Sequence, residues 1–252
     1  MTPHGSRRVK KSAAKVALVT GGAVRVGRAI ARELAMAGHD VAIGYRASAA
    51  AARQTVRELE RLGVRAVALR ADLADPGAAR RLVTRTVARL GRLDLLVNNA
   101  AIFLRTPVGT VTPAQFDRLI AVNLRGPFFC AQAAARVMAR RGGRIVNIAD
   151  VGAVRVWPGY VPYCISKAGL VTLTRGLAAA LAPGIQVNAV GPGVVLLPEG
   201  FSEEAQQKLA ARVPMRRHGR PEDVAAAVRF FATCPDYITG QVLFVDGGAT
   251  AL

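Results

Sequence analysis

Short apolar runs alternate with amphipathic stretches of about a dozen residues along most of the chain. The apolar runs predict buried strands at 16–20, 41–45, 64–69, 93–97, 144–148, 185–190 and 241–245. The amphipathic stretches predict helices at 25–37, 49–62, 76–90, 113–123, 127–140, 161–181 and 221–232. Strands that alternate with helices form right-handed βαβ units, which build a parallel sheet with helices on both faces. The pattern therefore predicts an α/β fold, a doubly wound parallel sheet of about seven strands that binds ligands at the carboxyl ends of its strands.

The ends of this pattern set the expected domain boundaries. Residues 1–14 are polar and basic, and we expect a disordered tail there. The apolar run at 16–19 is too short for the core of a signal peptide, which needs about 7–15 residues. Residues 15–252 read as one domain without linker or internal repeat. Pro, Gly and charge interrupt the pattern between 191 and 221, and a long irregular segment in a compact domain is often a lid or a binding loop.

The composition is that of a globular protein, with 52% apolar and 20% charged residues. Unbroken apolar runs stay well short of the roughly 18 residues of a membrane span, so we expect no membrane association. The three cysteines, Cys130, Cys164 and Cys234, are scattered and lack metal-ligand spacing, and the three histidines form no metal set either. We therefore expect reduced thiols, a cytoplasmic location and no metal.

The formal net charge of +19 raises the question of a nucleic-acid partner. The basic residues are mostly arginines spread along the whole chain, and they cluster only at 7–15 and 216–220. Neither cluster is interleaved with aromatic residues. We attribute the charge to a compositional bias toward arginine and to anionic small-molecule ligands, and we do not expect nucleic acid as a partner.

Tyr163 and Lys167 lie four residues apart in a predicted helix and therefore project from the same face. An ammonium beside a phenol favours the phenolate, which lowers the pKa of the phenol from its usual value of about 10 toward neutrality. A phenol tuned in this way can act as the acid or base at a reacting carbonyl or imine. The alternative is an ordinary tyrosine and lysine on an amphipathic helix.

The first strand leads into the next helix through the stretch TGGAVRVG at 20–27. Glycines let the backbone turn sharply and approach a pyrophosphate at a helix N-terminus. Because the stretch lacks the usual GxGxxG spacing, a strand-to-helix turn without a ligand is the alternative.

Further motifs follow in one order and at one spacing: Asn98-Asn99-Ala100, Asn123, YCISK at 163–167, VNAVGPG at 187–193 and YITGQVLFVDGG at 237–248. Together with the first turn, this set resembles the short-chain dehydrogenase/reductase family from about residue 16 to residue 248. The resemblance implies a nicotinamide-dependent oxidoreductase with a Rossmann fold, usually a homotetramer. It also implies that Tyr163 donates a proton, that Lys167 binds the nicotinamide ribose and lowers the pKa of Tyr163, and that Asn123 holds a proton-relay water.

Two residues depart from the usual pattern of that family. Arg25 stands where a glycine is usual, and Asp150, thirteen positions before Tyr163 (163 − 150), stands where the catalytic serine is usual. With Phe103, these departures resemble the pteridine reductases, and the stretch 191–200 looks like their bacterial members. This resemblance implies that Arg25 lies by the cofactor phosphates and the pterin. It also implies that Asp150 joins Tyr163 in protonation and that Phe103 stacks the pterin against the nicotinamide.

The chemistry of these residues agrees with a pterin substrate. A pterin is a flat polar ring that fits between an aromatic face and a nicotinamide, and its ring nitrogens need protons when hydride arrives. A ketone needs only a neutral hydroxyl, and a charged Asp150 would be costly beside an oxyanion. The alternatives are a solvated carboxylate for Asp150, a core or lid aromatic for Phe103 and an exposed helix-terminal residue for Arg25. An arginine at the positive end of a helix is unfavourable unless an anion is bound, which favours a phosphate neighbour.

The end of the second predicted strand, Tyr45-Arg46-Ala47-Ser48, indicates the cofactor. NAD-binding proteins place an acid there for the ribose hydroxyls, whereas an arginine and a hydroxyl suit the 2′-phosphate of NADPH. Asp72-Leu73 resembles an adenine-contacting pair, with a helix cap as the alternative role of the carboxylate. The expected cofactor-binding residues are Gly21, Arg25, Val26, Gly27, Tyr45, Arg46, Ser48, Asp72, Leu73, Asn99, Ala100, Lys167, Pro192, Gly193 and Val195.

These observations together predict an NADPH-dependent reductase that transfers hydride to a dihydropterin or dihydrofolate, with protonation assisted by Asp150 and Tyr163. One alternative is a carbonyl reductase of the same family, such as a 3-oxoacyl carrier-protein reductase. Another is a catalytically idle protein that binds a dinucleotide. Trp157 and Pro158 either line the substrate pocket or pack a subunit contact.

Overall fold

The computed structural model describes residues 14–196 and 202–251, so that all but the last residue of the predicted tail at 1–14 lies outside the described residues. Its centre is a seven-stranded sheet in the order β3-β2-β1-β4-β5-β6-β7, and every neighbouring pair is parallel. The strands are β1 (Val16–Val19), β2 (Asp40–Tyr45), β3 (Ala66–Arg70), β4 (Leu95–Asn98), β5 (Gly143–Ile148), β6 (Ile185–Pro192) and β7 (Val242–Val245). This order confirms the predicted doubly wound Rossmann fold.

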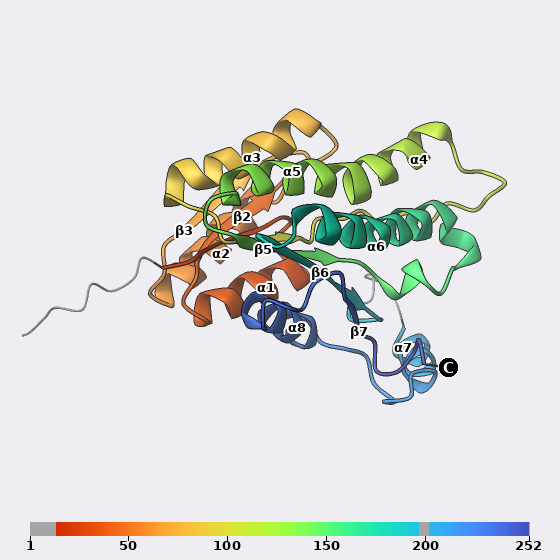
Figure 1. The fold of residues 1–252 in the computed structure, drawn as a ribbon. Helices are drawn as coiled ribbons and strands as arrows, with labels where there is room; N and C mark the ends of the chain where they lie inside the picture. The colour runs from red at the N-terminus through yellow and green to blue at the C-terminus, as the bar shows by residue number, and fades with distance from the viewer. Residues whose placement is uncertain (1–13, 197–201, 252) are drawn as a thin grey trace, which may run out of the picture.

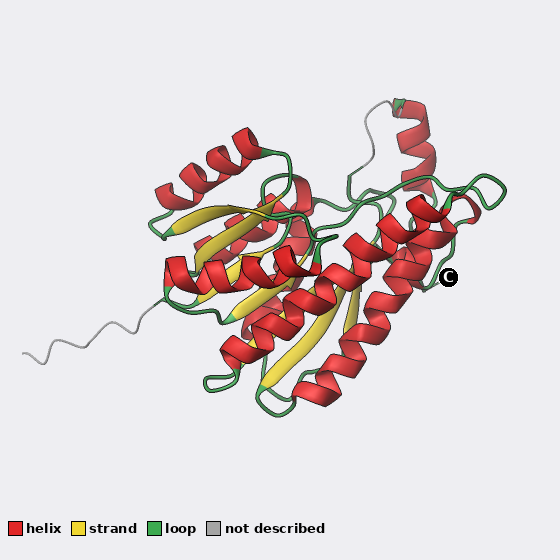
Figure 2. Ribbon diagram, turned by 90° about the horizontal axis from the view of Figure 1, so that it is seen from above, coloured by secondary structure: helices red, strands yellow, loops and turns green. Residues whose placement is uncertain are grey.

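Helices cover both faces of the sheet (Figure 1). One face carries α1 (Arg25–Met36), α2 (Ala49–Arg61) and α8 (Pro221–Thr233), and the other carries α3 (Pro76–Leu90), α5 (Gly126–Met138) and α6 (Val161–Leu181). Figure 2 shows the second group lying along the strands beneath it. Because both faces are covered, strands such as β1 are buried on both sides, which explains their uninterrupted apolar sequences.

Three elements differ from the sequence prediction. A helix, α7 (Glu203–Ala211), forms inside the segment 191–221, which was predicted to be irregular throughout. A π-helix, Ala121–Arg125, joins α4 (Pro113–Ile120) directly to α5, whereas two separate helices were predicted. β6 continues to Pro192 because its last residues pair with β7. The longer β6 carries the chain to the edge where the ligands of such folds bind.

A chain of buried amides and a hydroxyl fixes α6 against the sheet. Asn98 on β4 donates to Asn147 Oδ1 on β5 (2.9 Å), and Asn147 Nδ2 donates to Thr174 Oγ1 on α6 (2.9 Å). All three side chains are buried, where a hydrogen bond left unmade is costly. These bonds hold α6 in one register, which sets the position of the side chains at its N-terminal end.

The stretch 158–181, which contains α6, is the one helical segment of the described residues that is long and apolar enough by length and composition to cross a membrane. The sequence did not predict this property, because Lys167 and Arg175 interrupt the apolar run. A helix in the core of a domain passes the same test. Here α6 packs against β6 and buries Lys167 and Thr174.

Candidate active site

A cavity of about 640 Å³ opens at the carboxyl ends of the strands, where β1 and β4 lie side by side and the winding of the sheet reverses. The predicted site residues that line it are Gly21, Arg25, Val26, Gly27, Tyr45, Arg46, Asp72, Leu73, Asn99, Ala100, Phe103, Asp150, Tyr163, Lys167, Pro192, Gly193 and Val195. Ser48 and Asn123 are the predicted site residues outside this lining. The topology therefore brings nearly all of the predicted residues to one place.

The turn after β1 is held tightly against the end of β4. Gly21 has φ +64, in the left-handed region that favours glycine. Thr20 Oγ1 accepts hydrogen bonds from the backbone N–H groups of Asn99 (2.9 Å) and Ala100 (3.0 Å), and Asn99 Nδ2 donates to Thr20 O (2.8 Å). A Cβ on Gly27 would clash with the carbonyl oxygen of Gly21. The glycines therefore let the helix start directly behind the turn.

The N-terminus of α1 faces this turn without a side-chain cap, because the N-cap residue is Val24. Its first N–H groups are thus not satisfied by a capping side chain, which is the arrangement that binds phosphates at helix N-termini. Arg25, the first residue of α1, has φ +53, and its Nη2 donates to the carbonyl oxygen of Leu196 (3.2 Å). The left-handed backbone explains why a glycine is usual at this position. These features fit the pyrophosphate of a dinucleotide.

Three titratable side chains meet on the opposite side of the cavity. The Tyr163 hydroxyl donates to Asp150 Oδ2 (2.9 Å), and Asp150 Oδ1 accepts from the backbone N–H of Gly152 (2.7 Å). Lys167 Nζ donates to the carbonyl oxygen of Ile148 (2.8 Å) and lies 5.7 Å from the centroid of the Tyr163 ring. The carboxyl of Asp150 thus turns toward the phenol rather than toward solvent, as the sequence predicts.

Burial sets the direction of each pKa in this group. It raises the pKa of the Tyr163 phenol well above the usual value, and the adjoining Asp150 carboxylate raises that pKa further. Burial also raises the pKa of Asp150, against the opposing charge of Lys167. The pKa of Lys167 falls to about 8 through burial, although Asp150 opposes that change.

The pKa of Tyr163 is therefore raised in this structure and not, as the sequence predicted, lowered toward neutrality. The phenol is hydrogen-bonded to the carboxylate of Asp150, whereas the ammonium of Lys167 is bonded to the backbone of β5. A carboxylate at hydrogen-bonding distance favours the protonated phenol. Tyr163 and Asp150 thus form a hydrogen-bonded phenol–carboxylate pair, and the ammonium of Lys167 places a positive charge 5.7 Å from the phenol ring.

Asn123 lies in the π-helix, an element that often marks functional sites. Its Oδ1 accepts from the backbone N–H of Ile102 (2.9 Å), and its Nδ2 donates to Ile102 O (3.0 Å) and to Ser166 Oγ (3.1 Å). The side chain thereby ties the loop after β4 to α6. Its predicted role in holding a relay water stays a prediction.

Aromatic rings surround Tyr163. Phe103 stacks on Tyr160 with centroids 4.4 Å apart, and it meets Tyr163 edge to face at 4.7 Å. Trp157 lies parallel to Tyr163 at 6.3 Å. Trp157 and Tyr160 line the cavity, so Trp157 takes the first of the two roles left open above. The sequence did not predict a role for Tyr160, because this residue lies outside every motif named above.

The far end of the cavity lies at the ends of β2 and β3. Tyr45, Arg46, Asp72 and Leu73 line it, whereas Ser48 precedes α2 outside the lining. The carboxylate of Asp72 pairs with Arg118 (3.0 Å) and accepts from the backbone N–H of Ala74 (3.0 Å). It therefore does not cap α3, because Asp75 takes that role. Among the described residues, no group of three or more His, Cys, Asp or Glu side chains could hold a metal ion.

A single cavity with a phosphate-type turn on one side and an acid–base group on the other is typical of oxidoreductases that use a dinucleotide. Comparison with known proteins agrees with that class. A family model described as enoyl-(acyl carrier protein) reductase matches residues 22–250. The chain belongs to the short-chain dehydrogenase/reductase family.

Relatives of known activity cover nearly the full length of the chain. The 3-oxoacyl-[acyl-carrier-protein] reductase FabG of Staphylococcus aureus (strain Mu50) is 37% identical, over 93% of this chain and 97% of the relative. L-rhamnose 1-dehydrogenase (NAD(P)(+)) of Sphingomonas sp. is 39% identical, over 93% of this chain and 95% of the relative. A blue fluorescent protein from a metagenomic library, solved in complex with NADPH, is 40% identical with a TM-score of 0.86, over 93% of this chain and 97% of that chain. These comparisons support the family but not the predicted pteridine reductase subgroup.

Proposed function

We propose that this chain is an NADPH-dependent reductase that transfers hydride to a carbonyl carbon, with 3-oxoacyl thioesters as the first substrate class to test. The observation that carries this proposal is that the buried Tyr163 and Lys167 line the same cavity as the turn after β1. The relative from Staphylococcus aureus, a 3-oxoacyl carrier-protein reductase, supports the substrate class.

The end of β2 supports NADPH as the cofactor. Residues 45–48 contain Arg46 and no acid, which suits a 2′-phosphate rather than free ribose hydroxyls. The similar structure solved with NADPH agrees with this choice. The glycine turn and the uncapped start of α1 hold the pyrophosphate, Asp72 and Leu73 lie on the adenine side, and Lys167 holds the nicotinamide ribose. When bound, NADPH supplies the hydride.

The residues of this chain supply the proton. Tyr163 donates its hydroxyl proton to the substrate oxygen as that oxygen gains negative charge, and a proton taken up from solvent through Asp150 then restores the phenol. The ammonium of Lys167 stabilises both anions. One hydride and one proton add across the C=O bond, which gives the alcohol. The ammonium of Lys167 offsets the charge of Asp150, which reduces the cost of placing a carboxylate near a developing oxyanion.

A second candidate substrate is a pterin, and the hydrogen bond from Tyr163 to Asp150 favours it. A ring nitrogen of a dihydropterin needs a proton as hydride arrives at the adjacent carbon, and a paired phenol and carboxyl can supply it. Phe103 is 47% exposed, so one part of its surface stays open to a flat ring while Tyr160 covers another. Arg25 lines the same cavity, and its guanidinium can donate hydrogen bonds to the polar edge of such a ring.

A substrate panel with the full chain decides between these readings. Oxidation of NADPH is followed with acetoacetyl thioesters, simple ketones, dihydrobiopterin and dihydrofolate. Turnover of thioesters or ketones without pterin turnover supports the carbonyl reductase, and the reverse result overturns it in favour of the pterin. Binding of NADPH without oxidation by any substrate would indicate a catalytically idle protein. Equal kcat/KM with NADH would contradict the choice of cofactor.

Two variants sharpen the panel. If the substrate is a pterin, Asp150→Ser abolishes pterin reduction while ketone reduction persists or increases, because a serine hydroxyl suffices for a carbonyl. Phe103→Ala then raises KM for the pterin more than it lowers kcat, because the lost ring contacts the bound pterin but takes no part in proton transfer. Unchanged pterin kinetics in Asp150→Ser would remove that residue from the mechanism.

We also propose a homotetramer in the cytoplasm, on the family resemblance alone. Sedimentation equilibrium of the full chain measures the assembly directly, and a monomer at micromolar concentration would overturn this part of the proposal.

A further inference from the structure

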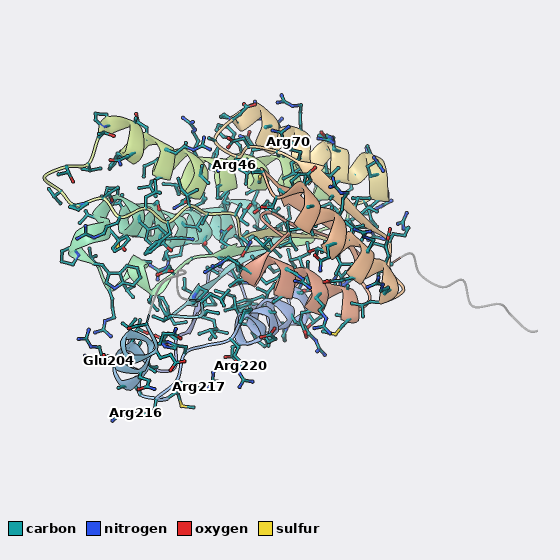
Figure 3. All side chains as sticks on the ribbon, turned by 180° about the vertical axis from the view of Figure 1, so that it is seen from behind. Arg46, Arg70, Glu204, Arg216, Arg217 and Arg220 are labelled. Atoms are coloured by element: carbon teal, nitrogen blue, oxygen red, sulfur yellow. The ribbon has the colours of Figure 1, made fainter. Side chains whose placement is uncertain are left out.

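Arg70, the last residue of β3, lies beside the cofactor end of the cavity although nothing in the family pattern singles it out. In the parallel register of β2 and β3, Arg70 stands opposite Tyr45. Its Nε donates to the backbone carbonyl oxygen of Arg46, the next residue along (3.2 Å). Figure 3 shows Arg46 and Arg70 at the same corner of the molecule. Two arginines therefore lie next to each other where β2 ends.

Positive charge at this corner lacks a matching acid. Both side chains are exposed, and neither forms an ion pair with any residue that the structure describes. Asp72, whose carboxylate feels the charge of Arg46, pairs with Arg118 instead. Arg85 on α3 adds a third guanidinium, because its Nη1 donates to the carbonyl oxygen of Arg70 (3.3 Å). Like charges this close repel one another, and a bound anion relieves that repulsion.

The geometry of Arg70 leaves it free to bind such an anion. Its Nε donates to the carbonyl oxygen of Arg46, which orients the guanidinium, while its two Nη groups form no hydrogen bond or ion pair with the residues that the structure describes. A planar guanidinium with two free N–H-bearing nitrogens matches the oxygens of a phosphate. In Rossmann folds, the group that lies at the end of the second strand is the ribose next to the adenine.

We propose that Arg70 and Arg46 together bind the 2′-phosphate of NADPH, so that the preference for NADPH depends on a residue of β3 as well as on the end of β2. This inference rests on the proposed NADPH dependence. It predicts that the preference is lost in part when either arginine is removed, and that neither arginine contributes to binding of the 5′-phosphate.

Calorimetric titration with two fragments tests this without turnover. The fragments are 2′,5′-ADP, which carries the 2′-phosphate, and 5′-AMP, which lacks it. In Arg70→Gln we expect the dissociation constant for 2′,5′-ADP to rise about tenfold, as for loss of one charge-assisted hydrogen-bonded contact, with no change for 5′-AMP. Arg46→Gln should behave alike. Arg89→Gln is the matched control. Arg89 is an exposed arginine at the C-terminal end of α3, which lies at the amino ends of the strands and away from the cofactor end of the cavity.

The possible results distinguish a failure of the role proposed for Arg70 from a failure of the proposed NADPH dependence. If the unmodified chain binds 2′,5′-ADP no more tightly than 5′-AMP, the NADPH assignment itself is wrong. If the unmodified chain prefers 2′,5′-ADP and Arg70→Gln keeps that preference, only the role of Arg70 is overturned. Equal weakening of both fragments would show that Arg70 merely shapes the strand end, which also overturns the role. The 5′-AMP titration reports in addition that each variant is folded.

Discussion

Arg25 holds a backbone conformation that arginine seldom adopts, with φ +53 in the left-handed region. A side chain there costs about 1 kcal/mol or more relative to glycine. We predict that Arg25→Gly raises the free energy of unfolding by about 1 kcal/mol, because the strain disappears. The same variant should bind NADPH more weakly, because a guanidinium next to the phosphate-binding turn is lost. Urea unfolding and a cofactor titration measure the two effects.

Arg25→Ala is the matched control for this prediction. It loses the same guanidinium but keeps a Cβ in the left-handed conformation, so it should lose cofactor affinity without gaining stability. A lower stability of Arg25→Gly than of the unmodified chain would contradict the strain argument. That outcome would show that the hydrogen bond from Arg25 to the carbonyl of Leu196 outweighs the backbone strain.

The lowered pKa of Lys167 predicts how the rate of reduction depends on pH. Burial lowers this pKa to about 8, so the ammonium is present below that pH and lost above it. Because the ammonium stabilises the anions formed during proton transfer, kcat/KM for reduction should fall as the pH rises through about 8. A profile that stays flat between about pH 7 and about pH 10 would contradict this.

Asp150→Ser provides the internal check on that assignment. Asp150 raises the pKa of Lys167, so its removal should move the falling limb of the profile to lower pH. A limb that stays in place, or moves to higher pH, would mean that another group titrates. The check is made with whichever substrate the variant still reduces.

At the scale of residues, the sequence predicted which groups meet but not how they influence one another. The four-residue spacing of Tyr163 and Lys167 and the position of Asp150 were sufficient to place them in one site. The direction of the phenol's pKa was not predictable, because it depends on whether the hydroxyl bonds to a carboxylate or lies next to an ammonium. Tyr160 was missed because one more tyrosine in a loop carries no pattern of its own.

At the scale of elements, the predictable parts were those with a strong period. Strands buried on both faces are continuous apolar runs, and the helices that cover them have one apolar face. The π-helix was not predictable, because one extra residue in a helical turn leaves little trace in the apolar pattern. α7 was not predicted, because the glycines, prolines and charged residues on both sides of 203–211 obscure the helical pattern of this short segment.

The packing of α1 behind the first turn makes a prediction at this scale. A Cβ on Gly27 would clash with the carbonyl oxygen of Gly21 and lie 2.5 Å from Asn99 Nδ2. Either α1 or the turn must then shift, so Gly27→Ala should lower the free energy of unfolding by about 2 kcal/mol and weaken cofactor binding. Chemical unfolding and a titration with NADPH measure both.

Gly176→Ala is the control, because Gly176 lies in the interior of α6 with no atom near the position of an added Cβ. Alanine is the better helix former, so this variant should gain about 0.5–1 kcal/mol. If Gly27→Ala proved as stable as the unmodified chain and bound NADPH equally well, the close packing of helix and turn would not be a requirement of the site.

At the scale of the whole molecule, the parallel sheet assembles the site from segments that are far apart in the chain. The turn at 20–27, the loop after β4, the end of β5 and the start of α6 all meet at the carboxyl edge. Sequence reasoning could predict this edge, because topology alone decides it. It could not predict the aromatic surface around Tyr163, because the distances between rings from separate loops depend on packing in three dimensions.

The charge of the whole chain leads to a last prediction. Basic residues outnumber acidic ones by 35 to 16, so repulsion among the excess cations opposes the compact state. Salt also weakens the surface ion pairs, but exposed pairs contribute little, about 0–1 kcal/mol each. Between about 0.01 M and about 0.15 M NaCl the Debye length falls from about 30 Å to about 8 Å. The melting temperature should therefore rise by a few degrees over that range, as differential scanning calorimetry can measure.

Sodium sulfate at equal ionic strength distinguishes general screening from anion binding. Screening depends mainly on ionic strength, so an equal rise in both salts would support self-repulsion as the cause. A much larger rise in sulfate that Arg46→Gln and Arg70→Gln abolish would instead locate the effect at the cofactor corner, where a divalent anion resembles the 2′-phosphate. Salt screens both the attraction within ion pairs and the repulsion among the excess cations. A melting temperature that falls with added NaCl would therefore show that attraction within the ion pairs is the larger of the two contributions, despite the net charge of +19.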